Sequence, residues 1–219
     1  MYLFQPVYAV LFALLFQWGV AVQDLRLGRV FIGRITLRKL AQEAAPTLRK
    51  SRRQLIKDYL VFPLLALPFG ANALAVLAGN VLANLLRNLW TFLVIFCGHF
   101  TERAAVFSKE SVAGESRGHW YLRQLRGSSN LEGGRLFHIL TGNLSHQIEH
   151  HLFPDIPARR YADMAPRVRE ICATYGVPYN TGSLPRQLLT VAWRIVRHSF
   201  PGGRADLSSL GEPATPLRS

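Results

Sequence analysis

The chain has 219 residues, of which 49% are hydrophobic and 18% are charged, and its formal net charge is +13. The apolar content excludes a disordered chain, and a count of two cysteines excludes a disulfide-stabilised scaffold. The positive charge lies beside apolar runs and accompanies no nucleic-acid-binding motif. It is therefore typical of the cytoplasmic flanks of a membrane protein, and nucleic acid is not an expected partner.

The first apolar segment covers residues 1–22, which carry no charged side chain. It is long enough to span a bilayer core at about 1.5 Å of rise per residue. Spanning would place the N-terminus on the far side from the basic stretch 23–58. A helix that lies in the interface or re-enters therefore stays an alternative.

The second apolar segment covers residues 59–100, and its only formally charged side chain is Arg87. Its length is roughly twice that of one span, and both of its flanks are basic. Because positive flanks stay on the cytoplasmic side, the segment predicts a transmembrane helical hairpin. The Pro-Phe-Gly-Ala-Asn sequence at 68–72 is the best candidate for its turn.

Residues 101–200 mix polar and apolar side chains and predict a helical cap on the cytoplasmic side of the membrane. We expect helices over 136–153, 158–175 and 184–196. The Gly/Pro/Ser-rich tail 201–219 is expected to be disordered. The predicted fold is an all-α integral membrane helical bundle, with one domain over residues 1–200.

A dense histidine cluster lies in the expected helix 136–153. On one helix, His146, Gln147, His150 and His151 would cover an arc of about 140°, with Asn143 on the same face and His138 facing away. Neutral imidazoles gathered in this way are good metal ligands. Glu149 would lie off this face and could orient an imidazole. His99, at the end of the second apolar segment, is a further candidate ligand. An interfacial pH-responsive patch is the alternative reading of the cluster.

The residues His-Gln-Ile-Glu-His-His-Leu-Phe-Pro at 146–154 resemble the third histidine box of membrane fatty acid desaturases. The stretches at 5–8, 17–20, 57–59, 87–90, 96–100 and 175–179 are similar to the bacterial acyl-CoA/acyl-lipid branch of that family. The box can be read as Gln147, His150 and His151, or as a second pattern that begins at His146.

The resemblance implies a histidine-ligated di-iron centre with O2 as co-substrate, which introduces a double bond into an acyl chain. It further implies a membrane-lipid setting, an acyl-CoA or acyl-lipid substrate, and an electron donor such as ferredoxin or a cytochrome b5-like protein. A lipid hydroxylase or ketolase on the same scaffold is the alternative within enzymes.

The chain departs from the family pattern because it contains no histidine before His99. The first two histidine boxes are therefore absent, and the chain resembles the C-terminal half of a desaturase. Too few ligands remain for two irons, so we expect this chain to be inactive by itself. A truncated gene product, a split subunit that pairs with an N-terminal half, a misassigned start and a non-catalytic membrane remnant are the open readings.

Overall fold

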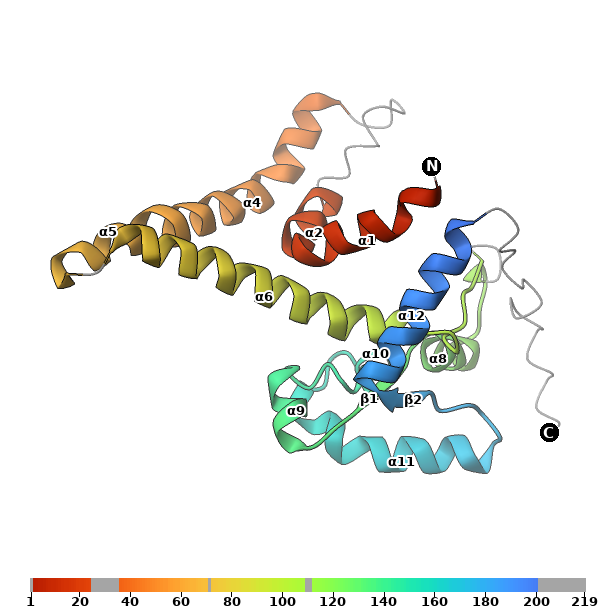
Figure 1. Cartoon of the computed structure of the whole chain (residues 1–219). Helices are drawn as coiled ribbons and strands as arrows, with labels where there is room; N and C mark the ends of the chain where they lie inside the picture. Colours follow the sequence, from red (N-terminus) through yellow and green to blue (C-terminus); the bar gives the residue numbers. More distant parts are fainter. Residues whose placement is uncertain (1, 25–35, 71, 109–111, 201–219) are drawn as a thin grey trace. The chain divides into compact units, whose positions relative to one another are not determined.

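The computed structural model describes residues 2–24, 36–70, 72–108 and 112–200. The chain is mostly helical and forms two compact units, one of residues Ala9–Phe92 and one of residues Met1–Tyr8 with Leu93–Ser219. Figure 1 shows the order of the elements along the chain. The expected disordered tail at 201–219 lies outside the described residues.

The N-terminal apolar segment is helical but bent. It forms η1 (Tyr2–Phe4), α1 (Gln5–Leu14) and α2 (Phe16–Asp24), and the chain turns by 99° between α1 and α2. The rings of Phe12 and Phe16 pack edge to face at 5.3 Å, and Phe16 packs on Phe92 at 5.9 Å. A bend of this size corresponds to a broken span or a re-entrant loop, the latter being one of the alternatives that the sequence left open.

The basic stretch and the second apolar segment together form two helical arms. The first runs through α4 (Leu37–Ile56), the π-helical turn η2 (Lys57–Val61), α5 (Phe62–Ala66) and η3 (Leu67–Phe69), and the second is α6 (Ala73–His99). Gly70 lies between them with a φ of 72°, so the predicted turn at 68–72 is confirmed. Within the described ranges, α6 is the one unbroken helix that is long and apolar enough to cross a membrane. Membrane crossing by both arms stays a prediction.

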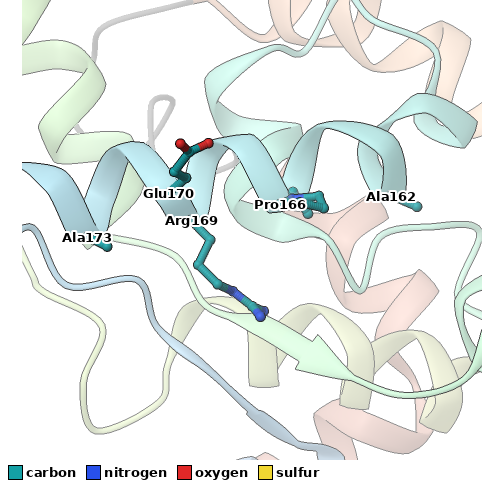
Figure 2. Close-up of a pocket in the computed structure, with 6 residues that line it drawn as sticks. Ala162, Pro166, Arg169, Glu170 and Ala173 are labelled. Carbon is teal, nitrogen blue, oxygen red and sulfur yellow. The ribbon is translucent and has the colours of Figure 1, made fainter.

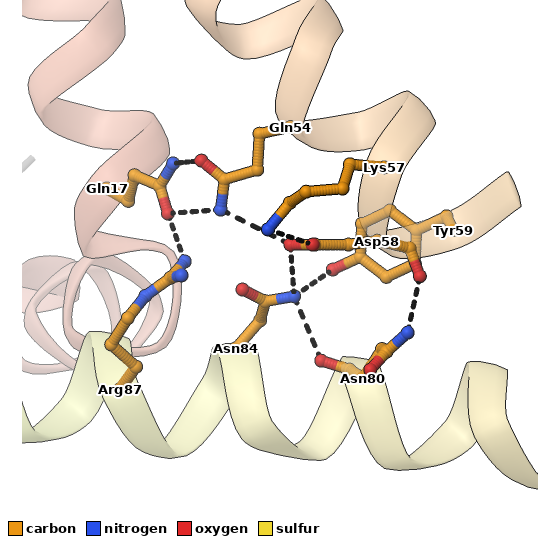
Figure 3. A network of polar contacts seen from close by, with 8 residues as sticks. All are labelled: Gln17, Gln54, Lys57, Asp58, Tyr59, Asn80, Asn84 and Arg87. Atoms are coloured by element: carbon orange, nitrogen blue, oxygen red, sulfur yellow. Dashed lines mark hydrogen bonds and ion pairs between the residues drawn. The ribbon is translucent and has the colours of Figure 1, made fainter. Parts of the chain in front are cut away.

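Polar side chains join the two arms (Figure 3). Asp58 is buried, forms an ion pair with Lys57 at 2.9 Å and accepts a hydrogen bond from Asn84 at 3.3 Å. Asn84 also donates to the hydroxyl of Tyr59 at 3.0 Å, and Asn80 donates to the backbone carbonyl of Asp58 at 2.5 Å. These bonds satisfy the buried carboxylate, whose burial without partners would be costly.

Two further polar residues join α6 to the N-terminal helices. The Arg87 guanidinium donates a hydrogen bond to the side-chain oxygen of Gln17, and the Asn88 amide donates to the backbone carbonyl of Leu14 at 2.9 Å. A charged side chain in an apolar helix normally has such a partner. The contact gives Arg87, the one formal charge in the segment 59–100, a structural role.

The turn at Gly70 supports a test of the hairpin. No neighbouring atom lies within 4 Å of a Cβ built at Gly70 or at Gly79, which is inside α6. Gly70→Ala should lower the free energy of unfolding by about 1 kcal/mol, because the left-handed backbone disfavours a side chain. Gly79→Ala should be neutral or stabilising by up to about 1 kcal/mol, because alanine favours helix. Thermal unfolding in detergent measures both, and equal shifts would contradict the turn.

The second unit contains the residues expected to form the cap, whose position on the cytoplasmic side of a membrane stays a prediction. It contains α8 (Arg117–Arg126), β1 (Asn130–Glu132), α9 (Arg135–Leu140), α10 (Gln147–Leu152), η4 (Ala158–Arg160), α11 (Tyr161–Thr174), β2 (Thr181–Ser183) and α12 (Leu184–Ser199). Its core consists of Leu125, Ile148, Leu152, Val168 and Cys172. The helices expected over 158–175 and 184–196 are confirmed. The short parallel pair β1–β2, in which Leu131 lies opposite Gly182, was not foreseen by the all-α prediction.

The single helix expected over 136–153 was wrong. The structure has α9, a turn at 141–146 and then α10. Gly142 and Asn143 have φ values of 61° and 60°, which cannot continue a right-handed helix. The Thr141 hydroxyl donates to the Ser145 hydroxyl at 3.0 Å across the turn. Asn143 therefore does not share a helix face with the histidines, although α10 does end just before Pro154 as expected.

Candidate metal centre

The histidine box lies against the last turn of α6. The rings of His99 and His151 are 4.8 Å apart at their centroids, and those of His150 and His151 are 5.5 Å apart. Glycine at position 98 makes this approach possible, because a Cβ there would lie 2.5 Å from the Cγ of Gln147. The fold therefore brings His99, Gln147 and His151 to one place from sequence positions about fifty residues apart.

Two of the histidines are oriented through their Nδ1 atoms. The Nδ1 of His151 lies 3.2 Å from the side-chain oxygen of Gln124, and the Nδ1 of His150 lies 3.2 Å from the hydroxyl of Tyr161. Because the Gln124 oxygen can only accept, His151 donates from Nδ1 and carries its lone pair on Nε2. Metal-binding histidines are commonly oriented in this way by a partner on the second ring nitrogen.

Three atoms of the box are buried without a hydrogen-bond partner in the described part of the chain: the Nε2 of His146, the side-chain oxygen of Gln147 and the Nε2 of His151. Buried polar atoms are nearly always paired, so such a group requires an explanation. Imidazole nitrogen and amide oxygen are both ligand atoms, and their chemistry fits iron. In residues 2–24, 36–70, 72–108 and 112–200, however, no three His, Cys, Asp or Glu side chains form a group that could hold a metal ion.

His146 lies next to His138, which was expected to face away from it. Its ring stacks on His138 with centroids 4.5 Å apart, and the Nδ1 of His138 contacts the hydroxyl of Ser145 at 2.7 Å. The prediction that His138 faces away from the cluster was therefore wrong, because the turn at 141–146 folds α9 back toward α10.

Glu149 is fully buried behind the box. It accepts hydrogen bonds from the Asn130 amide and from the Tyr179 hydroxyl, both at 2.8 Å, and its Oε2 lies 3.9 Å from the Nδ1 of His146. The Asn130 oxygen accepts from the backbone N–H of Ile148 at 2.8 Å. At 3.9 Å this approach is longer than a hydrogen bond, so the orientation of an imidazole by Glu149 stays a prediction. Sequence reasoning did not find Asn130, and it found Tyr179 only as part of the stretch 175–179.

The electrostatics of the site favour neutral imidazoles. Burial lowers the pKa of His146 to about 4, with a smaller effect from His138. Burial also lowers the pKa of His151 to about 4, with smaller effects from the neighbouring His99 and His150. Both rings are therefore neutral at pH 7, which is the form that binds a metal. Burial and the charge of Glu149 raise the pKa of Tyr179, which keeps its hydroxyl protonated as a donor.

These pKa shifts predict a pH-dependent stability of the metal-free chain. In the unfolded chain the two histidines take up protons near their ordinary pKa of 6.5, whereas in the fold they do so only near 4. The free energy of unfolding should keep its full value above pH 6.5. It should fall as the pH drops from 6.5 toward 4, because the unfolded state binds more protons than the folded state in this range. Unfolding midpoints across this range test it. His146→Asn and His151→Asn should flatten the profile, whereas His119→Asn, on the exposed face of α8, should not.

A hollow of about 390 Å³ lies along α11 and is lined by Ala162, Ala165, Pro166, Arg169, Glu170 and Ala173 (Figure 2). None of these residues belongs to the histidine box. The Arg169 guanidinium lies over the Tyr179 ring at 5.1 Å. Through Arg169, the hollow therefore lies next to Tyr179 of the Glu149 cluster.

Comparison with known proteins shows which family the sequence resembles. A sequence model of the family described as "Fatty acid desaturase" matches residues 2–183. The NADPH-dependent stearoyl-CoA 9-desaturase of Mycobacterium tuberculosis is 44% identical over 182 residues, which is 83% of this chain and 43% of the relative. Human fatty acid desaturase 3 is 34% identical over 88 residues, 40% of this chain and 19% of the relative. The chain thus spans less than half the length of these relatives, and no solved structure matches it.

Proposed function

Because the chain belongs to the fatty acid desaturase family, we propose that it supplies one side of an iron centre that desaturates acyl chains. The observation that carries this proposal is the set of three buried, unpartnered atoms on His146, Gln147 and His151. Their lone pairs have no partner in the described chain, and a bound cation would supply one.

His99, Gln147, His150 and His151 would hold the metal, with His146 as a further donor. When bound, a histidine-ligated iron pair supplies the O2-dependent oxidising power that removal of hydrogen from an unactivated methylene requires. The ligands contributed by this chain are fewer than such a pair needs. The remaining ligands would come from the two histidine boxes that the family pattern places earlier.

The chain's own residues would set the ligand geometry. Gly98 lets α10 approach α6, while Gln124 and Tyr161 contact the Nδ1 atoms of His151 and His150. Glu149, held by Asn130 and Tyr179, fixes the orientation of α10 from behind. Ligands supported by such outer contacts bind metal more tightly, typically by 10- to 100-fold.

The proposed substrate is a long-chain acyl group carried on coenzyme A. The Mycobacterium tuberculosis relative is by name a stearoyl-CoA 9-desaturase that depends on NADPH. An acyl substrate fits a chain whose α6 is apolar enough to cross a membrane. A reduced electron-transfer protein would deliver the electrons. We place the histidine box on the cytoplasmic side, because α4, which precedes the apolar hairpin, is strongly basic.

Iron analysis of the purified chain in detergent tests the proposal. We expect iron to bind with fewer than about two ions per chain, because the ligands present cannot saturate two ions and partial sites exchange metal readily. His151→Ala should lower the iron content, whereas His119→Ala should leave it unchanged. Two tightly held irons per chain, or iron that is insensitive to His151→Ala, would contradict this assignment of ligands.

A further inference from the structure

One face of α12 is apolar and exposed. Leu189, Trp193, Val196 and the capping residue Phe200 are 71%, 62%, 39% and 59% exposed. Their spacing of four, three and four residues places them on a single stripe of the helix. The opposite face packs into the cap through the buried Gln187 and Val191. The stripe is thus a surface that the described fold leaves uncovered.

Two hydrogen-bonded connections fix α12 to the end of α6. The Arg194 guanidinium donates to the backbone carbonyl of Thr101 at 2.9 Å, directly after α6 ends. The Gln187 amide donates to the Ser129 hydroxyl at 2.9 Å, and the backbone N–H of Ser129 donates to the carbonyl of Gly98 at 2.8 Å. These connections place α12 beside the C-terminal end of α6, a helix that is long and apolar enough to cross a membrane.

The chemistry of this surface matches an anionic bilayer. Arg186 and Arg197 lie beside the apolar stripe on the helix, and residues 184–199 contain no Asp or Glu. Tryptophan prefers the level of the lipid headgroups, and arginine attracts their phosphates. The helix η1 contacts α12, and its Phe4 is a second exposed aromatic side chain, 62% exposed.

We propose that α12, together with η1, lies flat on an anionic phospholipid bilayer, with Trp193 among the headgroups. An amphipathic helix of this type buries its apolar face about 5–10 Å into the boundary between headgroups and acyl chains. The contact would hold the cap, and with it the histidine box, against the membrane surface. The proposal concerns a membrane contact and does not depend on bound iron.

Tryptophan fluorescence of the full chain in vesicles tests the proposal. The chain has four tryptophans, so Trp18→Phe, Trp90→Phe and Trp120→Phe together leave Trp193 as the reporter. In vesicles that contain phosphatidylglycerol, brominated lipids should reduce its emission about twofold, because the ring lies within reach of the acyl chains. Acrylamide in the water should quench it weakly. In the chain that keeps its other three tryptophans, Trp193→Phe should remove the part of the emission that the brominated lipids quench at Trp193.

The results that would contradict this proposal differ from one another in the quenching that they predict. Strong acrylamide quenching without lipid quenching would show that the stripe faces water. Protection from both quenchers would show that protein covers it, either a second copy or another desaturase segment. Arg186→Gln with Arg197→Gln should weaken lipid quenching in phosphatidylglycerol vesicles, whereas the exposed Arg167→Gln on α11 should not. Equal quenching in phosphatidylcholine alone, unaffected by the arginine changes, would refute the preference for anionic lipid.

Discussion

Alanine at position 151 should abolish double-bond formation in cells that express this chain together with a desaturase segment supplying the other two histidine boxes. His151 is the residue that combines a ring next to His99, an Nδ1 contact with Gln124 and a buried, unpartnered Nε2. Losing an outer contact of a metal ligand typically costs about 10- to 100-fold in activity. Losing the ligand itself should cost more, so we expect double-bond formation to drop by more than about 100-fold. His150→Ala should have the same effect.

The fatty acid profile by gas chromatography measures this result. The matched control is His119→Ala, because His119 is an exposed histidine on α8 outside the box. If the remaining ligands come from other histidine boxes, as proposed, the unaltered 219-residue chain expressed alone should leave the profile unchanged. New double bonds from the lone chain would show that it needs no further boxes. If the His151→Ala chain still formed double bonds when expressed with that segment, His151 would not be a ligand.

Replacement of Glu149 by alanine should be among the most destabilising single changes in the cap. The carboxylate is fully buried and accepts from both Asn130 and Tyr179. Its removal takes the acceptor from the Tyr179 hydroxyl and one of two acceptors from the Asn130 amide, and it opens a buried cavity. The free energy of unfolding should therefore fall by about 3 kcal/mol. Tyr179→Phe should cost about 1–2 kcal/mol, because it removes one donor and preserves the ring.

Chemical unfolding of the chain in detergent measures both changes. The double variant should cost less than the sum of the single ones, since the two groups share one hydrogen bond. Glu170→Ala is the control, because Glu170 pairs with Arg167 at 2.6 Å but both side chains are more than 60% exposed. A surface pair of this kind contributes little. If Glu149→Ala were as mild as Glu170→Ala, the buried cluster would not be what orients α10.

Local sequence patterns determined a large part of this fold. Apolar runs and their basic flanks located the helices of the second segment, and Pro68 with Gly70 located the turn between them, because these residues act on the backbone within a few positions. The spacing of apolar residues over 158–175 and 184–196 predicted α11 and α12 for the same reason. The histidine box was found from composition and spacing alone, and the family resemblance that it carried is confirmed by the comparisons.

The tertiary structure determined which residues from distant parts of the sequence contact one another. The turn at 141–146 depends on positive φ values at Gly142 and Asn143, which helical periodicity does not reveal, and it placed His138 against His146. The approach of α10 to α6 rests on the missing side chain of Gly98. The cluster of Glu149, Asn130 and Tyr179 joins residues up to 49 positions apart. Contacts over such distances depend on how the elements pack. The sequence could therefore name the candidate ligands, but only the fold could show which of them lie together.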